Sequence, residues 1–373
     1  YGSTVPTADD VAITSDGSSY RVCVELSDVA GNPKAYGTSA TFIYDATPPV
    51  FTSLPLANDA ADGFLNLAEH SLTTDIVGPL AGSGYTTINY ALVSSSTTCA
   101  SALTWVSGVP KANDNLFNAV GNFKVCAQLT DGAGNSTYGA SPLIAYDNVP
   151  PVFTSIALAN DASDTYINAA EAAGSAVIVN SLVASGQDLV EYKVSLNSAT
   201  CSSEVGFVSA ASTSADFAGL NGDYKVCLKL SDNAGNATFG ASPVIHVDTA
   251  VPTFTSLALG VDVADTYLSI AEKSLTNSLA QTLVASNHDA AAYVVVAAST
   301  TCDGSLTYGA MPTDNSAAIS ANGATYKTCV KLTDNAGNAP AYGSTANFTA
   351  LIAAPTCTSL PLSGDATDGY INS

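Results

Sequence analysis

The sequence predicts an all-β fold class, in which sandwich repeats of about 100 residues follow one another like beads on a string. Two recurring phrases support this prediction. The first, PPVFTSLPLANDAADGFLNLAE, begins at Pro48 and returns in varied form at Pro150, Val251 and Ala354. The second, YRVCVELSDVAGN, begins at Tyr20 and returns at Phe123, Tyr224 and Tyr326. Together they place whole repeats at 48–149, 150–250 and 251–353, the C-terminal part of a repeat at 1–47 and the N-terminal part of one at 354–373.

Short apolar runs separated by turn residues make up each repeat. In repeat 150–250 they predict strands near Val152–Leu158, Ala176–Val183, Leu189–Leu196, Val205–Ser209, Asp216–Leu220, Tyr224–Leu230 and Pro243–Val247. Seven short strands without a helical period are typical of an immunoglobulin-like sandwich. The strand at 224–230 alternates apolar and polar residues, so Cys227 is expected on its solvent face, beside the lysines. The aromatic residue that opens this strand stands where a tyrosine corner is expected, although Phe123 has no hydroxyl to take part in one.

Composition narrows the possible partners. The chain has 32 acids against 10 Lys and Arg, a net charge of −22, which argues against nucleic acid and anionic membrane surfaces and favours cations. The 47% of hydrophobic residues indicates a folded chain. No apolar run reaches the length of about 18 residues that a membrane span requires, so no membrane insertion is expected in this segment.

The cysteines recur in pairs, one pair in each whole repeat. Their spacing predicts the disulfides Cys99–Cys126, Cys201–Cys227 and Cys302–Cys329, each linking a segment after the third strand to the strand of the second phrase. Such bridges imply an oxidising compartment. Cys23 and Cys357 are left without partners within the chain. Cys357 stands where the other repeats have phenylalanine, which favours a buried thiol over an inter-chain bridge.

Acidic residues recur at fixed places in the repeats. Asp59, Asp62, Asn66 and Glu69 reappear as Asp161, Asp164, Asn168 and Glu171, then as Asp262, Asp265, Ser269 and Glu272, and finally as Asp365, Asp368 and Asn372; linker aspartates stand at Asp45, Asp147 and Asp248. Hard oxygen ligands at close spacing suit calcium, so we hypothesise that these acids bind calcium near the repeat junctions. The pattern is not that of an EF-hand, because its third position is alanine.

The same residues have a purely structural interpretation. Asp-x-x-Asp-Gly is a good turn, and the D-x-A-G-N segments are good tight hairpins. These segments are Asp28–Asn32, Asp131–Asn135, Asp232–Asn236 and Asp334–Asn338. The last linker, at 351–354, has no aspartate, so the calcium hypothesis is weakest there.

The partial repeats at both ends would leave strands without partners for their backbone groups. We therefore expect the chain to continue on both sides. The alternative is a polymerising filament subunit, completed by strand exchange with neighbouring copies.

The PPVFTS phrase, the acidic DxxDGxxNxxE stretch and the YKVCxxLxDxAGN segment resemble the bacterial immunoglobulin-like repeats of large surface adhesins and extracellular fibres. The resemblance covers the whole chain. It implies an extracellular or cell-surface stalk whose interdomain calcium limits bending. The expected partners are neighbouring copies of the same repeat or chain, and a host, surface or matrix ligand. The disulfide of each repeat departs from the pattern, which puts a transfer of individual metal ligands in doubt.

Two other function classes remain to be weighed. An enzyme is not expected and no catalytic residue is predicted, because His70, His246 and His288 occupy non-equivalent positions in their repeats. A carbohydrate- or protein-binding module is the main alternative, with Trp105, Tyr85 and Tyr308 as candidate contacts. Near-identical repeats without a specialised unit favour the structural role. Asn135, Asn236 and Asn347 begin N-x-S/T sequences and are candidate glycosylation acceptors.

Overall fold

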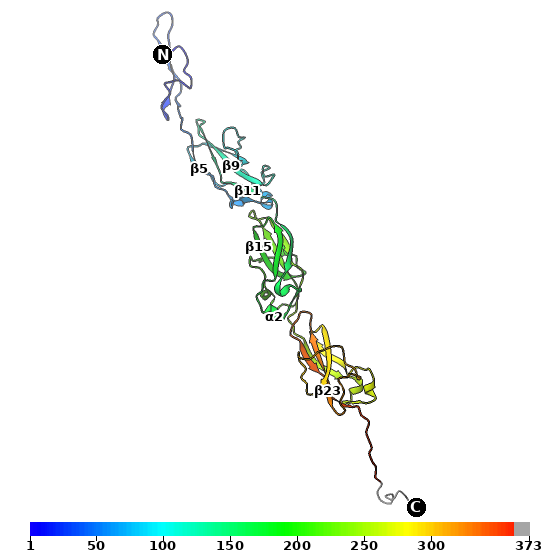
Figure 1. Ribbon diagram of the computed structural model, residues 1–373. Coiled ribbons are helices and arrows are strands. Elements are labelled where there is room, and N and C mark those ends of the chain that lie inside the picture. The colour runs from blue at the N-terminus through cyan, green and yellow to red at the C-terminus, as the bar shows by residue number, and fades with distance from the viewer. Residues whose placement is uncertain (362–373) are drawn as a thin grey trace, which may run out of the picture. The chain divides into compact units, whose positions relative to one another are not determined.

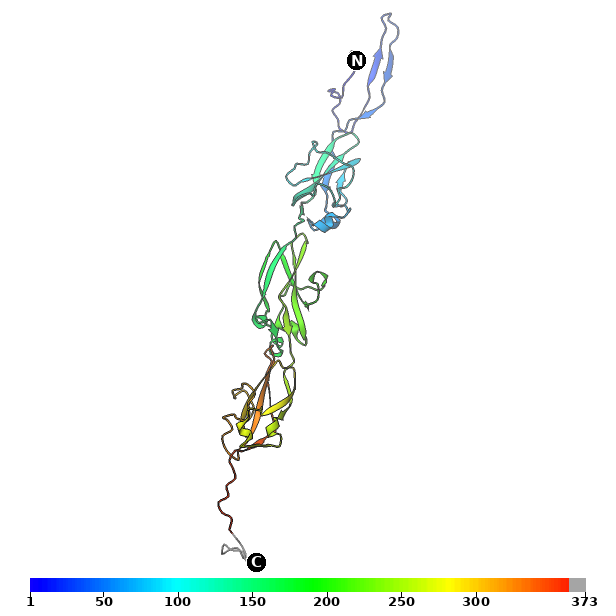
Figure 2. The same ribbon diagram turned by 90° about the vertical axis from the view of Figure 1, so that its right-hand side faces the viewer.

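The computed structural model describes residues 1–361, and their strands confirm the predicted all-β fold class (Figures 1 and 2). The described chain falls into two compact units. Unit 1 comprises residues 1–153, 184–190 and 229–239, and unit 2 comprises 154–183, 191–228 and the part from Gly240 onward. No helix among the described residues is long and apolar enough to cross a membrane. The repeat boundaries stay a prediction and serve below as labels.

Repeat 48–149, in unit 1, is built around one long central strand. Its elements are β5 (Val50–Ser53), η1 (Asn58–Ala60), β6 (Phe64–Leu65), α1 (Leu67–His70), β7 (Ala81–Ser83), β8 (Thr87–Ser94), β9 (Gly121–Thr130), β10 (Ser136–Ala140) and β11 (Ile144–Tyr146). Strand β9 pairs with β8 along one edge and with β10 and β11 along the other, and β6 joins β11 in parallel. Strands β5 and β7 form the second, two-stranded sheet.

The core of this repeat consists of apolar side chains from both sheets and from the loops between them. Its fully buried members include Leu54, Leu65, Ile76, Phe117, Val125, Leu129 and Ile144. Residues 125, 127 and 129 of β9 follow the two-residue period of a strand, which places all three on the core face. Burying one such side chain stabilises the fold by roughly 1.5–3 kcal/mol.

Repeat 251–353, in unit 2, has the same arrangement. Its elements are β19 (Thr253–Leu259), η5 (Val261–Val263), β20 (Tyr267–Ser269), η6 (Glu272–Ser274), β21 (Ala280–Ser286), β22 (Ala290–Ala297), β23 (Thr325–Thr333), β24 (Ala341–Ser344) and β25 (Phe348–Leu351). Strand β23 takes the central place, between β22 on one edge and β24 and β25 on the other. Strands β19 and β21 form the second sheet.

Residues 150–250 contribute to both units and show where the strand predictions were right. The strands here are β12 (Val152–Leu158), β13 (Tyr166–Ile167), β14 (Val179–Ser185), β15 (Leu189–Leu196), β16 (Gly222–Ser231), β17 (Ala237–Ala241) and β18 (Ile245–Val247). The sheet order is β13-β18-β16-β15 with β17 beside β16, and β12 pairs with β14. The bounds of β12 and β15 coincide with the predicted ones, whereas β13 and β17 were not predicted.

Two predicted strands of this repeat were wrong. The segment at 205–209 makes only a single bridge, between Val208 and Tyr192. The segment at 216–220 instead begins inside the 3-10 turn η4 (Ser214–Phe217). There Asp216 forms a capping box with Thr213 by accepting the Thr213 N–H at 2.7 Å. A carboxylate that returns to its own backbone in this way favours a turn over a strand.

The tyrosine corner is present at Tyr326 and at Tyr20. The Tyr326 hydroxyl accepts the backbone N–H groups of Ser320 and Ala321 at 3.3 and 3.2 Å. Tyr20 makes the equivalent bonds in the 1–47 segment, where β1 (Ser19–Tyr20) pairs with β4 (Phe42–Ile43) and β2 (Cys23–Leu26) pairs with β3 (Ala35–Thr38). Phe123 packs edge-on against Phe117 instead, with ring centroids 5.0 Å apart.

Candidate functional site: disulfides and repeat junctions

Each whole repeat contains one disulfide. The bonded pairs are Cys99–Cys126, Cys201–Cys227 and Cys302–Cys329, the same pairs that the spacing predicts, with Cα–Cα distances of 5.5, 5.4 and 5.5 Å. In every case the second cysteine lies on the central strand of the larger sheet. The bridge therefore ties the loop after β8, β15 or β22 to the middle of that sheet.

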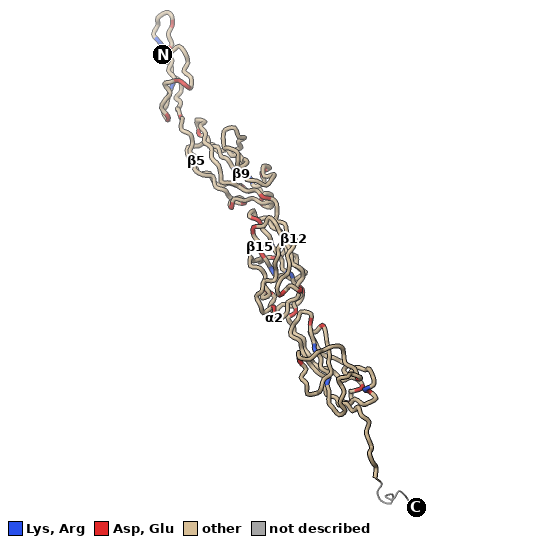
Figure 3. The backbone as a smooth tube through the Cα atoms, in the orientation of Figure 1, with Lys and Arg blue, Asp and Glu red and all other residues tan. Residues whose placement is uncertain are grey.

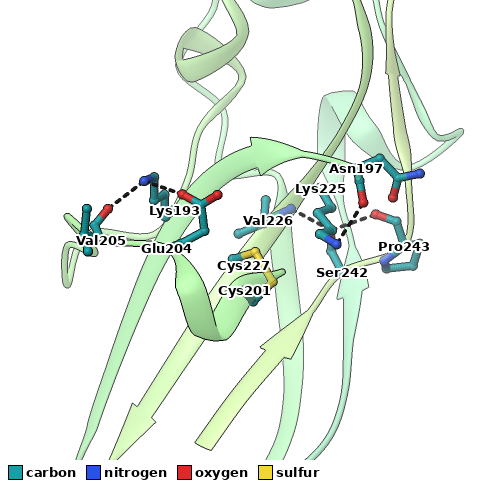
Figure 4. Close-up of a disulfide and its surroundings, with 10 residues drawn as sticks. All are labelled: Lys193, Asn197, Cys201, Glu204, Val205, Lys225, Val226, Cys227, Ser242 and Pro243. Carbon is teal, nitrogen blue, oxygen red and sulfur yellow. Dashed lines mark hydrogen bonds and ion pairs between the residues drawn. A yellow bond between two sulfur atoms is a disulfide. The ribbon is translucent and has the colours of Figure 1, made fainter. Parts of the chain in front are cut away.

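The surroundings of Cys227 correct one prediction. Cys227 shares its strand face with the lysines at 225 and 229 and was expected to be exposed. It is fully buried, as are Cys126 and Cys329. The loop that carries Cys201 lies beside this face and is held by further contacts (Figure 4). Lys193 forms an ion pair with Glu204 at 2.5 Å and donates to the Val205 carbonyl at 2.6 Å. The strand pattern identified the face, but it could not show that a loop covers it.

The two remaining cysteines, Cys23 and Cys357, are free and exposed. The prediction of a buried thiol at Cys357 was therefore wrong. The phenylalanines at equivalent positions pack into a complete repeat, and the residues described after Cys357 provide no sheet to cover it.

The D-x-A-G-N segments form compact turns organised by their aspartate. The Asp131 carboxylate accepts the N–H groups of Ala133, Gly134 and Asn135 at 2.8–2.9 Å, and it also accepts the Asn135 side-chain amide at 2.9 Å. The amide of Asn135 is the main cause that lowers the pKa of Asp131. Gly134 has φ +100°, a left-handed conformation that favours glycine.

The same asparagine side chains reach the preceding linkers. Asn135 donates to the carbonyl of Asp45 at 3.0 Å, Asn236 to that of Asp147 at 2.9 Å and Asn338 to that of Asp248 at 2.8 Å. We call this recurring contact the asparagine clamp. Each linker aspartate thus contributes a backbone oxygen, while its carboxylate accepts the N–H two residues further on. This Asx-type bond shapes the linker at all three places.

The acidic stretches, whose Asp and Glu residues are red in Figure 3, form helix caps. Asn66 is the N-cap of α1, and its side chain accepts two backbone N–H groups. In turn the Glu69 carboxylate accepts the Asn66 N–H at 3.0 Å. Asn168 and Glu171 repeat this capping box at α2 (Ala169–Ala172), and Glu272 accepts the Ser269 N–H at 2.7 Å. Burial, and then the nearby aspartates, raise the pKa of Glu69 and Glu171.

Five of the remaining acids of these stretches accept hydrogen bonds. Asp62, Asp164 and Asp265 each accept a backbone N–H two residues ahead at 3.0 Å. Asp59 accepts the Thr74 hydroxyl, and Asp262 accepts the Asn277 amide at 2.8 Å. Asp161 lies beside Gly174, at the end of the same stretch. Asp365 and Asp368 lie outside the described residues, as does Asn372.

The capping asparagines extend the contacts at two junctions. Within unit 1, Asn66 donates to the Ala234 carbonyl at 2.8 Å, in the turn of the following repeat. Within unit 2, Asn168 donates to the Ala336 carbonyl at 3.1 Å, and Asn338 accepts the Ala169 N–H at 2.9 Å. The acidic stretch of one repeat and the D-x-A-G-N turn of the next therefore meet at the same junction.

A pocket of about 280 Å³ lies at the junction within unit 1. Its lining includes the residues Asp147, Asp188 and Asp232. Among residues 1–361, however, no group of three or more His, Cys, Asp or Glu side chains is arranged to hold a metal ion. Asp188 was not among the predicted residues. Its carboxylate accepts the Asn233 N–H at 2.9 Å, and Asp289 makes the equivalent bond in the next repeat; this recurrence is the signal that could have identified it.

The candidate binding aromatics pack against the sandwich surface. Trp105 lies 5.6 Å from the ring of Tyr138, and Tyr308 lies 5.9 Å from that of Tyr342. Tyr85 packs against the core of its repeat. These equivalent pairings show one recurring packing position at Trp105 and Tyr308.

The glycosylation candidates differ in whether the side-chain nitrogen of the asparagine is already hydrogen-bonded. Those of Asn135 and Asn236 are engaged in the asparagine clamp, and Asn236 is only 8% exposed. Asn347 is exposed.

Comparisons with known proteins give structural neighbours only. No protein-family model and no curated protein matches the chain. A Ca²⁺-stabilised adhesin with which an Antarctic bacterium binds ice is similar in structure, with 18% identity over 89% of this chain and 81% of that one and a TM-score of 0.38. A tetra-tandem repeat from the extending region of a large adhesion protein has 16% identity over 92% and 84%, with a TM-score of 0.32. Drosophila N-cadherin EC1-4 has 15% identity over 91% and 85%, with a TM-score of 0.29.

The chain is thus similar to tandem repeats of adhesion proteins, and the resemblance to bacterial adhesin repeats is confirmed at this level. At these identities and TM-scores the likeness carries no argument about function. The function proposed next therefore rests on the chain's own residues.

Proposed function

We propose that this chain is a stalk or filament segment of a secreted cell-surface adhesin or fibre. The observation that carries the proposal is the asparagine clamp, which recurs with the same donor and acceptor atoms at Asp45, Asp147 and Asp248. A contact repeated at each of these linkers suits a chain whose purpose is to hold successive repeats in order. Because the same contact recurs, it does not distinguish any one repeat as a specialised binding or catalytic unit.

The clamp opposes bending because bending separates its atoms. One hydrogen bond contributes about 0.5–1.5 kcal/mol, and bonds to a charged group contribute about twice as much. Asn338 makes four bonds, namely two to Asp334, one to the Asp248 carbonyl and one from the Ala169 N–H. Removing its side chain takes away three of them at once.

The disulfides make each repeat resist extension when the chain is pulled. They join residues 26 or 27 positions apart, so a pulled chain cannot extend the segment between the two cysteines. Three such bonds also require an oxidising compartment, which supports a location at the cell surface or outside the cell.

A variant series tests the clamp. Replacing Asn135, Asn236 and Asn338 together by alanine should widen the distribution of end-to-end distances, measured by small-angle scattering or by spin labels on the outer repeats. Asn347→Ala is the matched control, because this exposed asparagine takes no part in a clamp. If the triple variant and the control give the same distribution, the clamp does not limit bending.

We also propose that calcium binds near the junctions, as the recurring acids suggest. Asp147, Asp188 and Asp232 line one pocket, and calcium takes six to eight oxygen ligands, backbone carbonyls and waters among them. Binding here must draw these side chains together and would stiffen the linker. Thermal unfolding in calcium and in chelator tests the proposal, with Asp188→Asn as the variant. Equal midpoints in the two conditions would exclude a structural calcium at this junction.

A further inference from the structure

Two tyrosine rings lie side by side next to the disulfide of repeat 251–353. Tyr308 lies shortly after Cys302 in the connection between β22 and β23, and Tyr342 lies on β24. Their ring centroids are 5.9 Å apart, and the ring planes are tilted by 40°. Both side chains are half-buried, so they are partly shielded from other chains but open to a small molecule.

The hydroxyls of the two tyrosines meet the same short segment. The Tyr308 hydroxyl donates to the Asp303 carbonyl at 3.1 Å, and the Tyr342 hydroxyl lies beside Gly304. Both phenols therefore converge just after Cys302, where the disulfide closes its loop. Burial raises the pKa of Tyr308, and Tyr342 and then Asp303 add to the shift, so this phenol keeps its proton at neutral pH.

The other whole repeats have aromatic residues at the same two positions, but not two tyrosines. They are Trp105 and Tyr138 in repeat 48–149, with ring centroids 5.6 Å apart, and Phe207 and Phe239 in repeat 150–250. The residue after the first aromatic makes the same isolated bridge in each repeat, which confirms that the positions correspond. Packing at this place requires only two rings, so the pair of hydroxyls distinguishes repeat 251–353.

We propose that Tyr308 and Tyr342 are a site of oxidative cross-linking, where a haem peroxidase using hydrogen peroxide joins them as dityrosine. Each phenol loses one electron and its hydroxyl proton and becomes a radical, whose unpaired electron is shared with the ring carbons beside the oxygen. The two radicals form one carbon–carbon bond between such carbons, and the hydrogens on these carbons move to the two oxygens. Hydrogen peroxide takes up the two electrons and two protons and leaves as two molecules of water.

The positions of the rings suit a link within one molecule. A side-chain rotation brings the ring edges together, and Tyr308 has the freedom to make it because it lies in a connection and not in a strand. The link ties this connection to β24, which the disulfide does not join, and reducing agents do not cleave it. The supply of oxidant rests on the proposed location outside the cell, whereas the geometry of coupling does not.

Treating the full chain with a haem peroxidase and limiting hydrogen peroxide tests the site. The exposed Cys23 and Cys357 are replaced by serine, so that the oxidant does not join chains through them. After digestion, mass spectrometry should find the peptides that contain Tyr308 and Tyr342 joined, with two hydrogen atoms lost. Tyr308→Phe, which keeps the ring as in repeat 150–250, should not give this product.

Two controls make the assignment specific. Tyr267→Phe removes an exposed tyrosine from the same repeat and should keep the product. A mixture of isotope-labelled and unlabelled chains should give joined peptides that carry one isotope only, because the link forms within one molecule. Locating the joined residues by mass separates this product from coupling of Tyr1 with Tyr36, whose ring centroids are 6.1 Å apart. Absence of the joined peptides from the oxidised wild type, or joined peptides of mixed isotope, would overturn the proposal.

Thermal unfolding shows whether the link acts as a second staple. Once the disulfides have been reduced, repeat 251–353 of the oxidised wild type should unfold at a higher temperature than that of oxidised Tyr308→Phe, because the remaining link still constrains the unfolded chain. Before oxidation the two proteins should differ by less. Equal midpoints after oxidation and reduction would contradict a stabilising role for the link.

Discussion

Removing the disulfide of repeat 150–250 should destabilise that repeat alone. The variant is Cys201→Ser with Cys227→Ala, made in a background in which the exposed Cys23 and Cys357 are serine so that no thiol can exchange. The cysteines are 26 positions apart, and closing a loop of that size contributes about 3.5 kcal/mol through the entropy of the unfolded chain. Alanine fits the fully buried position of Cys227 without introducing a polar atom.

Differential scanning calorimetry measures the effect. For a domain of about 100 residues, 1 kcal/mol corresponds to roughly 4–8 °C, so the transition of this repeat should fall by roughly 15–25 °C. The transitions of the other two repeats should stay in place, and reducing the background protein should lower all three. A variant whose melting curve matches the background would refute the reasoning. A shift of every transition would show that the repeats do not unfold independently.

Three further predictions concern single residues. Tyr326→Phe should destabilise repeat 251–353 by about 0.5–1.5 kcal/mol in chemical denaturation, because two backbone N–H groups lose their acceptor, and an unchanged midpoint would contradict this. Burial raises the pKa of Asp314, an acid in the connection between β22 and β23, to about 7 in the folded state, above its unfolded value. The stability that the wild type has relative to Asp314→Ser should therefore fall as the pH rises from about 4 to 7, and a difference that grows with pH would refute this. In a host that glycosylates, mass spectrometry should find sugar on the exposed Asn347 and none on Asn236, whose side-chain nitrogen already donates two hydrogen bonds; sugar on Asn236 would mean that the clamp opens.

How far the sequence predicts the fold depends on how clearly each strand stands out as a short apolar run. Val152–Leu158 and Leu189–Leu196 are strands with the predicted bounds, because both are rich in apolar and β-branched residues and have no local competitor. Asp216 supplies such a competitor by capping a turn. Ala237–Ala241 was missed because alanine and glycine leave only one large apolar residue to mark a strand.

The candidate site was harder to predict because capping and metal binding use the same atoms. Asn66 and Glu69 look like calcium ligands in the sequence, yet in the structure they cap a helix and reach the next turn. The clamp was not visible, since it uses the backbone carbonyl of Asp147 and not its carboxylate.

Pulling the chain from its ends in a single-molecule force experiment tests the central claim most directly, namely that its repeats are separate, disulfide-stapled units that carry load. The account predicts one unfolding step for each whole repeat, three in all. Under oxidising conditions each step should be shortened by the 26 or 27 residues between its cysteines, and reduction should lengthen it by roughly 90 Å. A single step for the whole chain, or steps that reduction leaves unchanged, would contradict the account.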